Sequence, residues 1–310
     1  MSALNEIRKF EKHHAAILIF LLIAGIFLIN IFAFQAAYSR VDDARENGLS
    51  QVIVVGPDDV AQTAAPEPVE PVKFLAGLED GINQIIENTG DNVDVAVMIH
   101  DLKTGELLGI NEKTTFVSAS LYKIFTSYEV ARQIDEGTLS PTQATGFDAG
   151  ELSVQECLDR TLSYSDNDCG RALRKLIGAN DAPIPAVNDA GFISTSLVNA
   201  YPTTSATDVD LFFERLYEGE TFTEATNDLL LEPMLRQQVD NRLPQGVPDG
   251  TKIAHKTADL DGYSHDAGIF YTDGGDYILS VLTGPWANGY TDAPATHIAI
   301  SKLVYDWYND

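Results

Sequence analysis

Three short motifs of reactive side chains limit the folds that this chain can adopt. The first, Ser120–Lys123, places a serine and a lysine three residues apart, so on a helix the hydroxyl and the amine share one face. The second, Ser165–Asn167, adds a hydroxyl and a carboxamide, and the third, Lys256–Ala258, adds an ammonium and a hydroxyl in a strand-like segment. Together these groups suffice to attack an amide carbonyl, protonate its nitrogen and hold a carboxylate. The fold must therefore bring three distant segments together.

Ser120 and Lys123 have the properties of a nucleophile and its base. A serine hydroxyl is a weak nucleophile without a base beside it, and an ordinary lysine is protonated. Burial lowers the pKa of a lysine and makes it a candidate base. Free N–H groups at the start of a helix also stabilise an oxyanion. The ordinary alternative is a helix-capping serine followed by a surface lysine.

The other two motifs have ordinary alternatives as well. The residue types of Ser165–Asn167 favour polar turns and helix caps. Lys256 is typical of a lysine that guards an exposed edge strand. The combination and order of the three motifs therefore carry the functional prediction, and no single motif does.

The combination resembles the S-x-x-K, S-D-N and K-T-G motifs of class A β-lactamases and penicillin-binding proteins. Residues 116–119 before Ser120 and residues 261–269 after the third motif extend the resemblance, which covers about residues 74–310. It implies a β-lactamase/transpeptidase-like fold and an enzyme that works without a cofactor or a metal ion.

The resemblance also implies a role for each residue of the motifs. Ser120 attacks the substrate carbonyl, Lys123 is the base, and Ser165 relays a proton to the leaving nitrogen. Asn167 hydrogen-bonds the substrate amide, and Lys256 helps to hold a substrate carboxylate. The substrate-binding residues are expected to be Thr257, Ala258 and Asp259. The N–H groups of Ser120 and Asp259 would form the oxyanion hole.

The loop after the second motif departs from the family pattern. Active class A β-lactamases carry a glutamate there that activates the deacylating water, whereas residues 190–206 contain no glutamate. Asp208 is the nearest carboxylate, but Ser205–Asp208 has the pattern of a capping box. We therefore expect acylation followed by slow hydrolysis.

The third motif departs from the pattern too. Ala258 replaces a glycine and narrows the space for a substrate backbone. Strand side chains alternate, so Asp259 should point the same way as Thr257 and place a carboxylate beside the carboxylate pocket. Like charges there disfavour binding unless a proton or a cation intervenes. No arginine follows Arg242, so the family's clamping arginine on the last strands or helix has no counterpart.

The remaining sequence predicts an α/β (α+β) domain. Apolar residues at helical spacing predict a helix from Phe74 and a second from Ser120 to near Gly137. Strands are predicted at residues 93–99, 107–110, 252–258, 265–271 and 277–283, before a closing helix. We expect a mixed antiparallel sheet covered by the terminal helices, with a separate helical lobe.

The N-terminal segment has the features of a membrane anchor. Residues 15–38 contain no charged side chain and would form a helix about 36 Å long, enough to cross a hydrocarbon core of about 30 Å. Basic residues precede it, so residues 1–14 should form a cytoplasmic tail. Residues 39–73 read as an acidic, proline-containing linker, and residues 74–310 as a catalytic domain outside the cytoplasm. A lipid bilayer is thus one expected partner.

Cys157 and Cys169 are the only cysteines, and they bracket Ser165–Asn167. Disulfides persist in exported proteins, and one here would close a loop that carries catalytic groups. We predict a disulfide between them, the alternative being two buried thiols. Their spacing is not that of a zinc site, and no histidine pair accompanies them.

The acidity of the chain narrows the choice of partners. Its formal net charge is -26 at pH 7, which repels phosphate backbones and argues against nucleic-acid binding. We therefore predict a membrane-anchored, β-lactamase-like serine hydrolase whose partner is a small-molecule β-lactam. The alternatives are a D-Ala-D-Ala carboxypeptidase or transpeptidase acting on peptidoglycan stem peptides, and a receptor that binds β-lactams or cell wall without hydrolysis.

Overall fold

The computed structural model describes residues 75–90, 92–179, 184–198 and 200–309. The predicted cytoplasmic tail, membrane span and linker lie outside these residues. Within the described ranges, no helix is both long enough and apolar enough to cross a membrane.

A five-stranded antiparallel sheet forms the centre of the domain, in the order β2-β1-β7-β6-β5. Its strands are β1 (Asp94–Asp101), β2 (Leu107–Ile110), β5 (Lys252–Leu260), β6 (Tyr263–Tyr271) and β7 (Tyr277–Gly284). Every pair of neighbours in this sheet is antiparallel, so the predicted mixed character is wrong. The strand order makes β5 an edge strand, and residues 119–121, which include Ser120, contact it.

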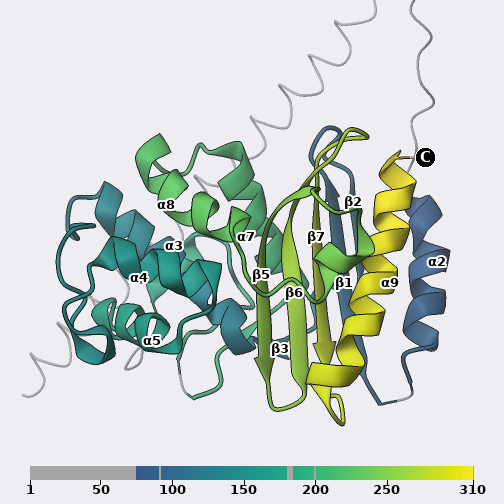
Figure 1. Cartoon of the computed structure of the whole chain (residues 1–310), viewed down its shortest axis with the longest axis horizontal. Helices are drawn as coiled ribbons and strands as arrows, with labels where there is room; N and C mark the ends of the chain where they lie inside the picture. The colour runs from purple at the N-terminus through teal and green to yellow at the C-terminus, as the bar shows by residue number, and fades with distance from the viewer. Residues whose placement is uncertain (1–74, 91, 180–183, 199, 310) are drawn as a thin grey trace, which may run out of the picture. The chain divides into compact units, whose positions relative to one another are not determined.

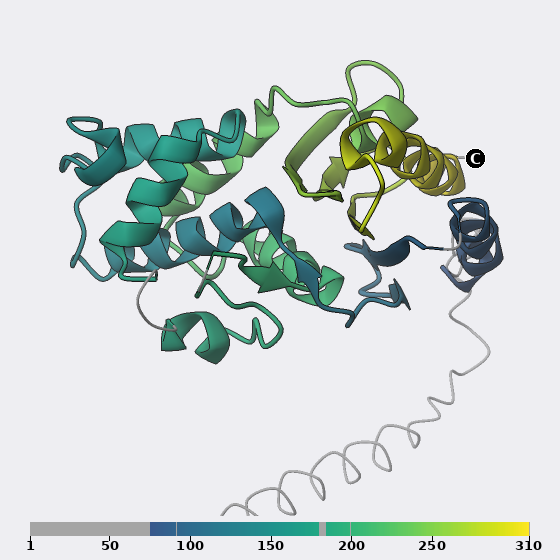
Figure 2. The ribbon, with the colours of Figure 1, turned by 90° about the horizontal axis from the view of Figure 1, so that it is seen from below.

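The first and last helices cover one face of the sheet (Figures 1 and 2). These helices are α2 (Ala76–Glu87) and α9 (Gly289–Asn309), and they pack against each other. Leu78 and Ile82 of α2 meet Ile300 and Val304 of α9 in one hydrophobic cluster, which also contains alternate residues of β1 and β7. The prediction of a sheet covered by terminal helices is confirmed.

A helical lobe covers the other face and extends away from the sheet on the left of Figure 1. Its longer helices are α3 (Tyr122–Asp135), α4 (Val154–Ser163), α5 (Asn167–Leu176), α7 (Ala206–Glu218) and α8 (Glu224–Leu235). Shorter elements are β3 (Phe116–Val117), η1 (Ala119–Leu121), η2 (Phe147–Ala149), α6 (Pro185–Asp189), β4 (Thr203–Thr204) and η3 (Leu243–Gly246). Helix α7 packs against β1, β6 and β7, while α8 and η1 contact β5. The lobe thus meets the sheet both at its inner strands and at the edge strand β5.

The two faces of β1 belong to two different cores. Val97 and Ile99 lie in the cluster under α2 and α9, whereas Ala96 and Met98 lie in the cluster of the lobe. Strand side chains alternate, so one short strand joins both cores. Phe125 of α3 lies at the centre of the lobe, and its ring makes edge contacts with other aromatic rings there.

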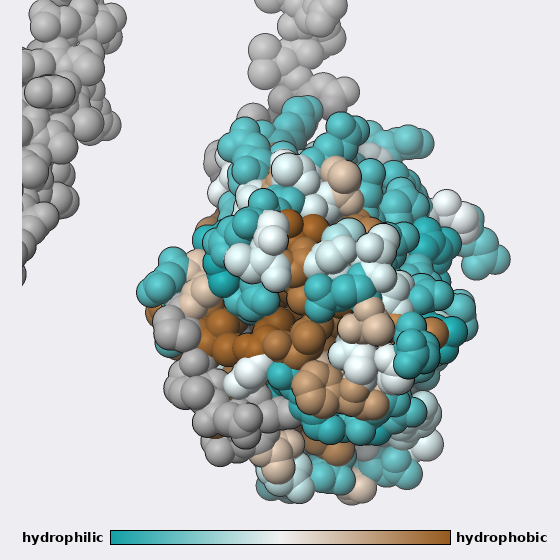
Figure 3. Space-filling view, turned by 90° about the vertical axis from the view of Figure 1, so that its left-hand side faces the viewer, coloured by the Kyte–Doolittle hydropathy of each residue, from teal (hydrophilic) through white to brown (hydrophobic). Residues whose placement is uncertain are grey.

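The end of the lobe is not uniformly hydrophilic. Figure 3 shows hydrophobic residues reaching the surface there, surrounded by hydrophilic ones. Among the described residues of the lobe, Ile193 is a large hydrophobic side chain that is 81% exposed. Scattered exposure of this kind is normal for a folded domain.

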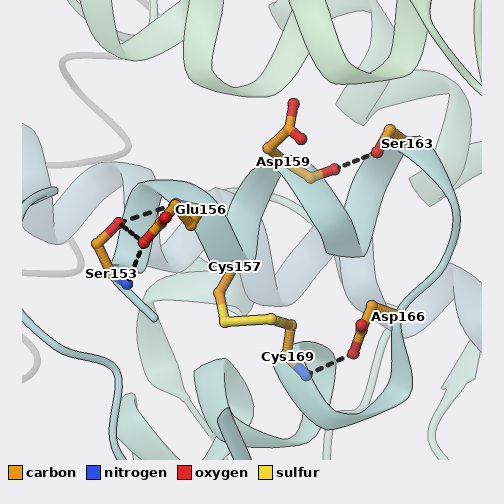
Figure 4. Close-up of a disulfide and its surroundings, with 7 residues drawn as sticks. All are labelled: Ser153, Glu156, Cys157, Asp159, Ser163, Asp166 and Cys169. Atoms are coloured by element: carbon orange, nitrogen blue, oxygen red, sulfur yellow. Dashed lines mark hydrogen bonds between the residues drawn. A yellow bond between two sulfur atoms is a disulfide. The ribbon is translucent and has the colours of Figure 1, made fainter. Parts of the chain in front are cut away.

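A disulfide joins α4 to α5 through Cys157 and Cys169, as the sequence predicted (Figure 4). Both ends of this connection are further fixed by helix caps. Ser153 and Glu156 form a reciprocal capping box at the start of α4. Asp166 caps α5 by accepting a hydrogen bond from the N–H of Cys169 at 2.9 Å. The disulfide and the cap made by Asp166 therefore fix the start of α5, directly after the turn that carries the Ser165–Asn167 motif.

Replacing both cysteines by alanine should lower the free energy of unfolding by about 3 kcal/mol, because the bond closes a loop of 12 residues. Denaturant unfolding of the purified exported protein measures this. Wild-type protein kept reduced is the control, and it should lose a similar amount. Recovery of two freely alkylated thiols from oxidised protein would contradict the disulfide.

Candidate active site

Ser120 lies in the short turn η1, directly before α3, and its side chain is partly exposed. The preceding segment is fixed by two hydrogen bonds to one backbone carbonyl. Both the N–H and the hydroxyl of Ser118 donate to the carbonyl of Pro202, at 2.8 and 3.0 Å. Ala119 has a φ of 46°, a left-handed conformation that alanine rarely adopts. Such strain persists only where the surroundings enforce it, and it often marks a functional turn.

Lys123 is completely buried one turn after Ser120. Its Nζ donates to the carbonyl oxygen of Ser165 at 2.6 Å, to the hydroxyl of Ser165 at 3.1 Å and to Oδ1 of Asn167 at 2.8 Å. Burial lowers the pKa of Lys123 from 10.5 to about 8. At pH 7 about one molecule in ten then carries a neutral amine at this position. Lys123 thus meets the main requirement of a base.

Ser165 is the meeting point of two motifs. Its Oγ accepts from Lys123 Nζ at 3.1 Å and from Lys256 Nζ at 3.0 Å. A hydroxyl has two acceptor lone pairs and one donor hydrogen. With both lone pairs engaged, the hydrogen is left to donate to another group. Ser165 also has a φ of 64°, so its backbone is held in an unusual conformation at the same place.

Lys256 on β5 is buried as completely as Lys123. Its Nζ also donates to the carbonyl of Thr257 at 2.7 Å. Burial, and next the charge of Lys123, hold the pKa of Lys256 well below 10.5. Two lysines that share one hydroxyl disfavour each other's charged form. The site therefore favours having at least one of them neutral.

The structure thus brings together Lys123, Ser165, Asn167 and Lys256. Among the described residues, no hydrogen bond joins the hydroxyl of Ser120 to Lys123, although the two lie one turn apart. Asn167 is exposed, whereas Thr257 and Ala258 are buried at 3% and 2% exposure. Asn167 is therefore open to solvent, whereas little of Thr257 is.

From the sequence we expected the carboxylate of Asp259 to be unpaired. In the structure it is paired with an arginine. Arg242, whose side chain is fully buried, donates to its carboxylate. Ser264 Oγ donates to the other carboxylate oxygen at 3.0 Å. The sequence analysis identified no cation that could pair with Asp259. The structure shows that this cation is Arg242, which lies in the segment before β5. No periodic pattern marks Arg242, so only the fold reveals it.

Asp208 has a structural role. Its carboxylate accepts from the N–H of Ser194 at 2.8 Å and from the hydroxyl of Thr195 at 2.7 Å. Ser205 caps α7 by accepting from the N–H of Asp208, but the carboxylate does not complete the predicted capping box. Burial raises the pKa of Asp208. This side chain fastens the loop and is not available to replace the missing glutamate.

His265 is a buried residue near the site that sequence reasoning missed. Its Nδ1 accepts from the N–H of Thr283 at 3.1 Å, so its Nε2 carries the hydrogen and donates to the carbonyl of Val117 at 2.8 Å. Burial lowers the pKa of His265 to about 4. A neutral histidine therefore connects β6 to the strand that leads into Ser120. Its only signal in the sequence was its place after the third motif.

A serine at a helix start, a buried lysine one turn later and a second buried lysine on an edge strand are typical of serine hydrolases that work through an acyl-enzyme. A profile of the Beta-lactamase enzyme family matches residues 77–308, and the chain belongs to this family. Its class is therefore that of the β-lactamase-like serine hydrolases. No curated protein matches the sequence.

Several solved structures share the fold. PBP-A superposes with a TM-score of 0.69 at 20% identity, over 77% of this chain and 98% of that one. A β-lactamase from Xanthomonas campestris pv. campestris gives 0.67 at 22% identity, over 74% and 97% of the two chains. An ancestral class A β-lactamase gives 0.67 at 18% identity, over 74% and 99%. These likenesses establish the β-lactamase-like fold.

Proposed function

We propose that this domain opens β-lactam amides by forming an acyl-enzyme at Ser120, and that it releases the acyl group slowly. The observation that carries the proposal is the contact of Lys123 and Lys256 with one hydroxyl, that of Ser165. This arrangement supplies a base and a path for its proton. A mutant of PBP-A has been solved as an acyl-enzyme complex with penicillin G, which supports β-lactams as the substrate class.

The reaction begins with the neutral form of Lys123. Its Nζ takes the proton of the Ser120 hydroxyl while Oγ bonds to the carbonyl carbon of the substrate. The carbonyl oxygen becomes an oxyanion, which the N–H groups of Ser120 and Asp259 stabilise. When the carbon–nitrogen bond breaks, the nitrogen takes the proton of the Ser165 hydroxyl. The ammonium of Lys123 then returns a proton to Ser165, and Asn167 holds the substrate amide.

The acyl group is released slowly because the loop after the second motif contains no glutamate. Hydrolysis of the acyl-enzyme needs a base that activates a water molecule. Residues 190–206 contain no glutamate, and the carboxylate of Asp208 is engaged with Ser194 and Thr195. The same lack favours a second candidate function, a D-Ala-D-Ala carboxypeptidase or transpeptidase of the cell wall. The third candidate is a receptor that keeps the acyl group.

We also propose that residues 15–38 anchor the protein in a membrane and leave the catalytic domain outside the cytoplasm. The support is the length and apolar character of this segment. The basic residues before it favour a cytoplasmic N-terminus.

A labelling and chase experiment tests the function. Purified protein should bind fluorescent penicillin covalently, and the label should fade slowly during a chase with unlabelled penicillin, with release of the hydrolysed product. A label that never fades would favour a receptor or a peptidase, and release of D-alanine from a D-Ala-D-Ala peptide would identify the peptidase. Absence of any label would contradict the proposed function.

A further inference from the structure

Asp259 is fixed in a closed ring of three side chains. Arg242 donates through Nη2 to one carboxylate oxygen, and Ser264 Oγ donates to the other at 3.0 Å. Arg242 Nε also donates to Ser264 Oγ at 3.0 Å. The guanidinium is fully buried, and its Nη1 makes no hydrogen bond to any described residue. The one positive charge of Arg242 is therefore matched by the one negative charge of Asp259.

The ring lies next to the edge-strand motif. Asp259 pairs across the sheet with Ser264, and Thr257 pairs with Asp266. Residues two apart on a strand point to the same face, about 7 Å from each other. A carboxylate held at Thr257 would thus lie close to the carboxylate of Asp259. Arg242 is already bound to Asp259, so its charge is not available to attract a substrate carboxylate.

A cavity of about 310 Å³ opens beside Asp259 at the end of β5. Its lining includes Asp259, Leu260, Asp261, Tyr263, Asn288 and Tyr290. It contains two carboxylates and no lysine or arginine. Leu260 and Tyr290 are 36% and 67% exposed, so the cavity has an apolar and aromatic rim. Such a surface suits an uncharged or positively charged group and disfavours an anion.

We propose that Asp259 determines specificity by occupying Arg242 in place of a substrate carboxylate. The site then selects acyl donors that are neutral or cationic at the position next to the scissile amide. This inference rests on the proposed acyl-enzyme at Ser120. The bound group would lie along the end of β5, with its far side in the cavity beside Tyr263.

The test compares penicillin G, which carries the carboxylate, with its methyl ester, which does not. The second-order acylation rate of each probe is measured by intact-mass spectrometry. The wild-type protein should react with the ester at least as fast as with the acid. In Asp259→Asn, which keeps the shape and removes the charge, the ratio of acid to ester rates should rise at least tenfold. Asp249→Asn, on the exposed loop before β5, makes the same change in net charge and should leave the ratio unchanged.

Each outcome decides the proposal. An Asp259→Asn protein that unfolds like the wild type and keeps the wild-type ratio would overturn it. If that variant does not fold, the wild-type comparison still decides, since an acid that reacts faster than its ester contradicts the proposal. Absence of labelling by either probe would instead remove the acyl-enzyme function, and the specificity proposal with it.

Discussion

Ser120→Ala should abolish covalent labelling by penicillin G, with a loss of acylation rate on the order of 10³-fold or more. Ser120 lies in η1, directly before α3 and directly after the strained Ala119, and it is partly exposed one turn before Lys123. In the part of the chain that the structure describes, no other hydroxyl combines this exposure with the start of a helix and a buried lysine one turn later. Intact-mass spectrometry after incubation with the antibiotic measures the adduct.

Ser140→Ala is the matched control, because Ser140 is an exposed serine outside the site. It should label like the wild type. Equal adduct formation in Ser120→Ala and the wild type would show that another residue is the nucleophile.

Lys123→Met should lower the acylation rate by about 10²- to 10⁴-fold while the fold survives. Methionine roughly conserves the volume of the buried side chain but cannot accept a proton. The same reasoning predicts a pH dependence in the wild type. The pKa of Lys123 is about 8, so the neutral amine and the acylation rate should fall about tenfold for each pH unit below 8. Above pH 8 the rate should level off.

Stopped-flow acylation across this pH range measures both effects. Lys302→Met, which removes an exposed lysine on α9, should keep the wild-type rate and profile. A folded Lys123→Met protein that retains the wild-type kinetics would assign the base to another group.

Local patterns were sufficient to predict most of the sheet and the outer helices. Alternating apolar residues marked β5, β6 and β7, and helical spacing marked α2 and α9. The order of the three motifs predicted which segments meet, and Lys123, Ser165 and Lys256 do lie together. These predictions succeeded because each depends on periodicity or on residue types that are close in the sequence.

Periodicity and short motifs could not predict contacts between segments that are far apart in the sequence. The bond from Arg242 to Asp259 depends on how the turn before β5 packs under β6, and no pattern in either segment records it. The link from His265 to Val117 has the same origin. Strand alternation places Asp259 on the same face as Thr257. It gave no information on which side chains bind Asp259 there. The charge balance around Asp259 therefore had to come from the structure.

The strand order has a consequence for how the protein is made. Strand β7 lies between β1 and β6, so Asp94 near the start of the domain pairs with Gly284 near its end. A ribosome that has not yet released β7 holds two separate hairpins, β2-β1 and β6-β5, each with an unpaired edge. Long-range pairing of this kind folds slowly, and open edges invite aggregation. The incomplete sheet therefore keeps open edges until β7 is made, and a truncated product that lacks β7 has no complete sheet on which to assemble the site.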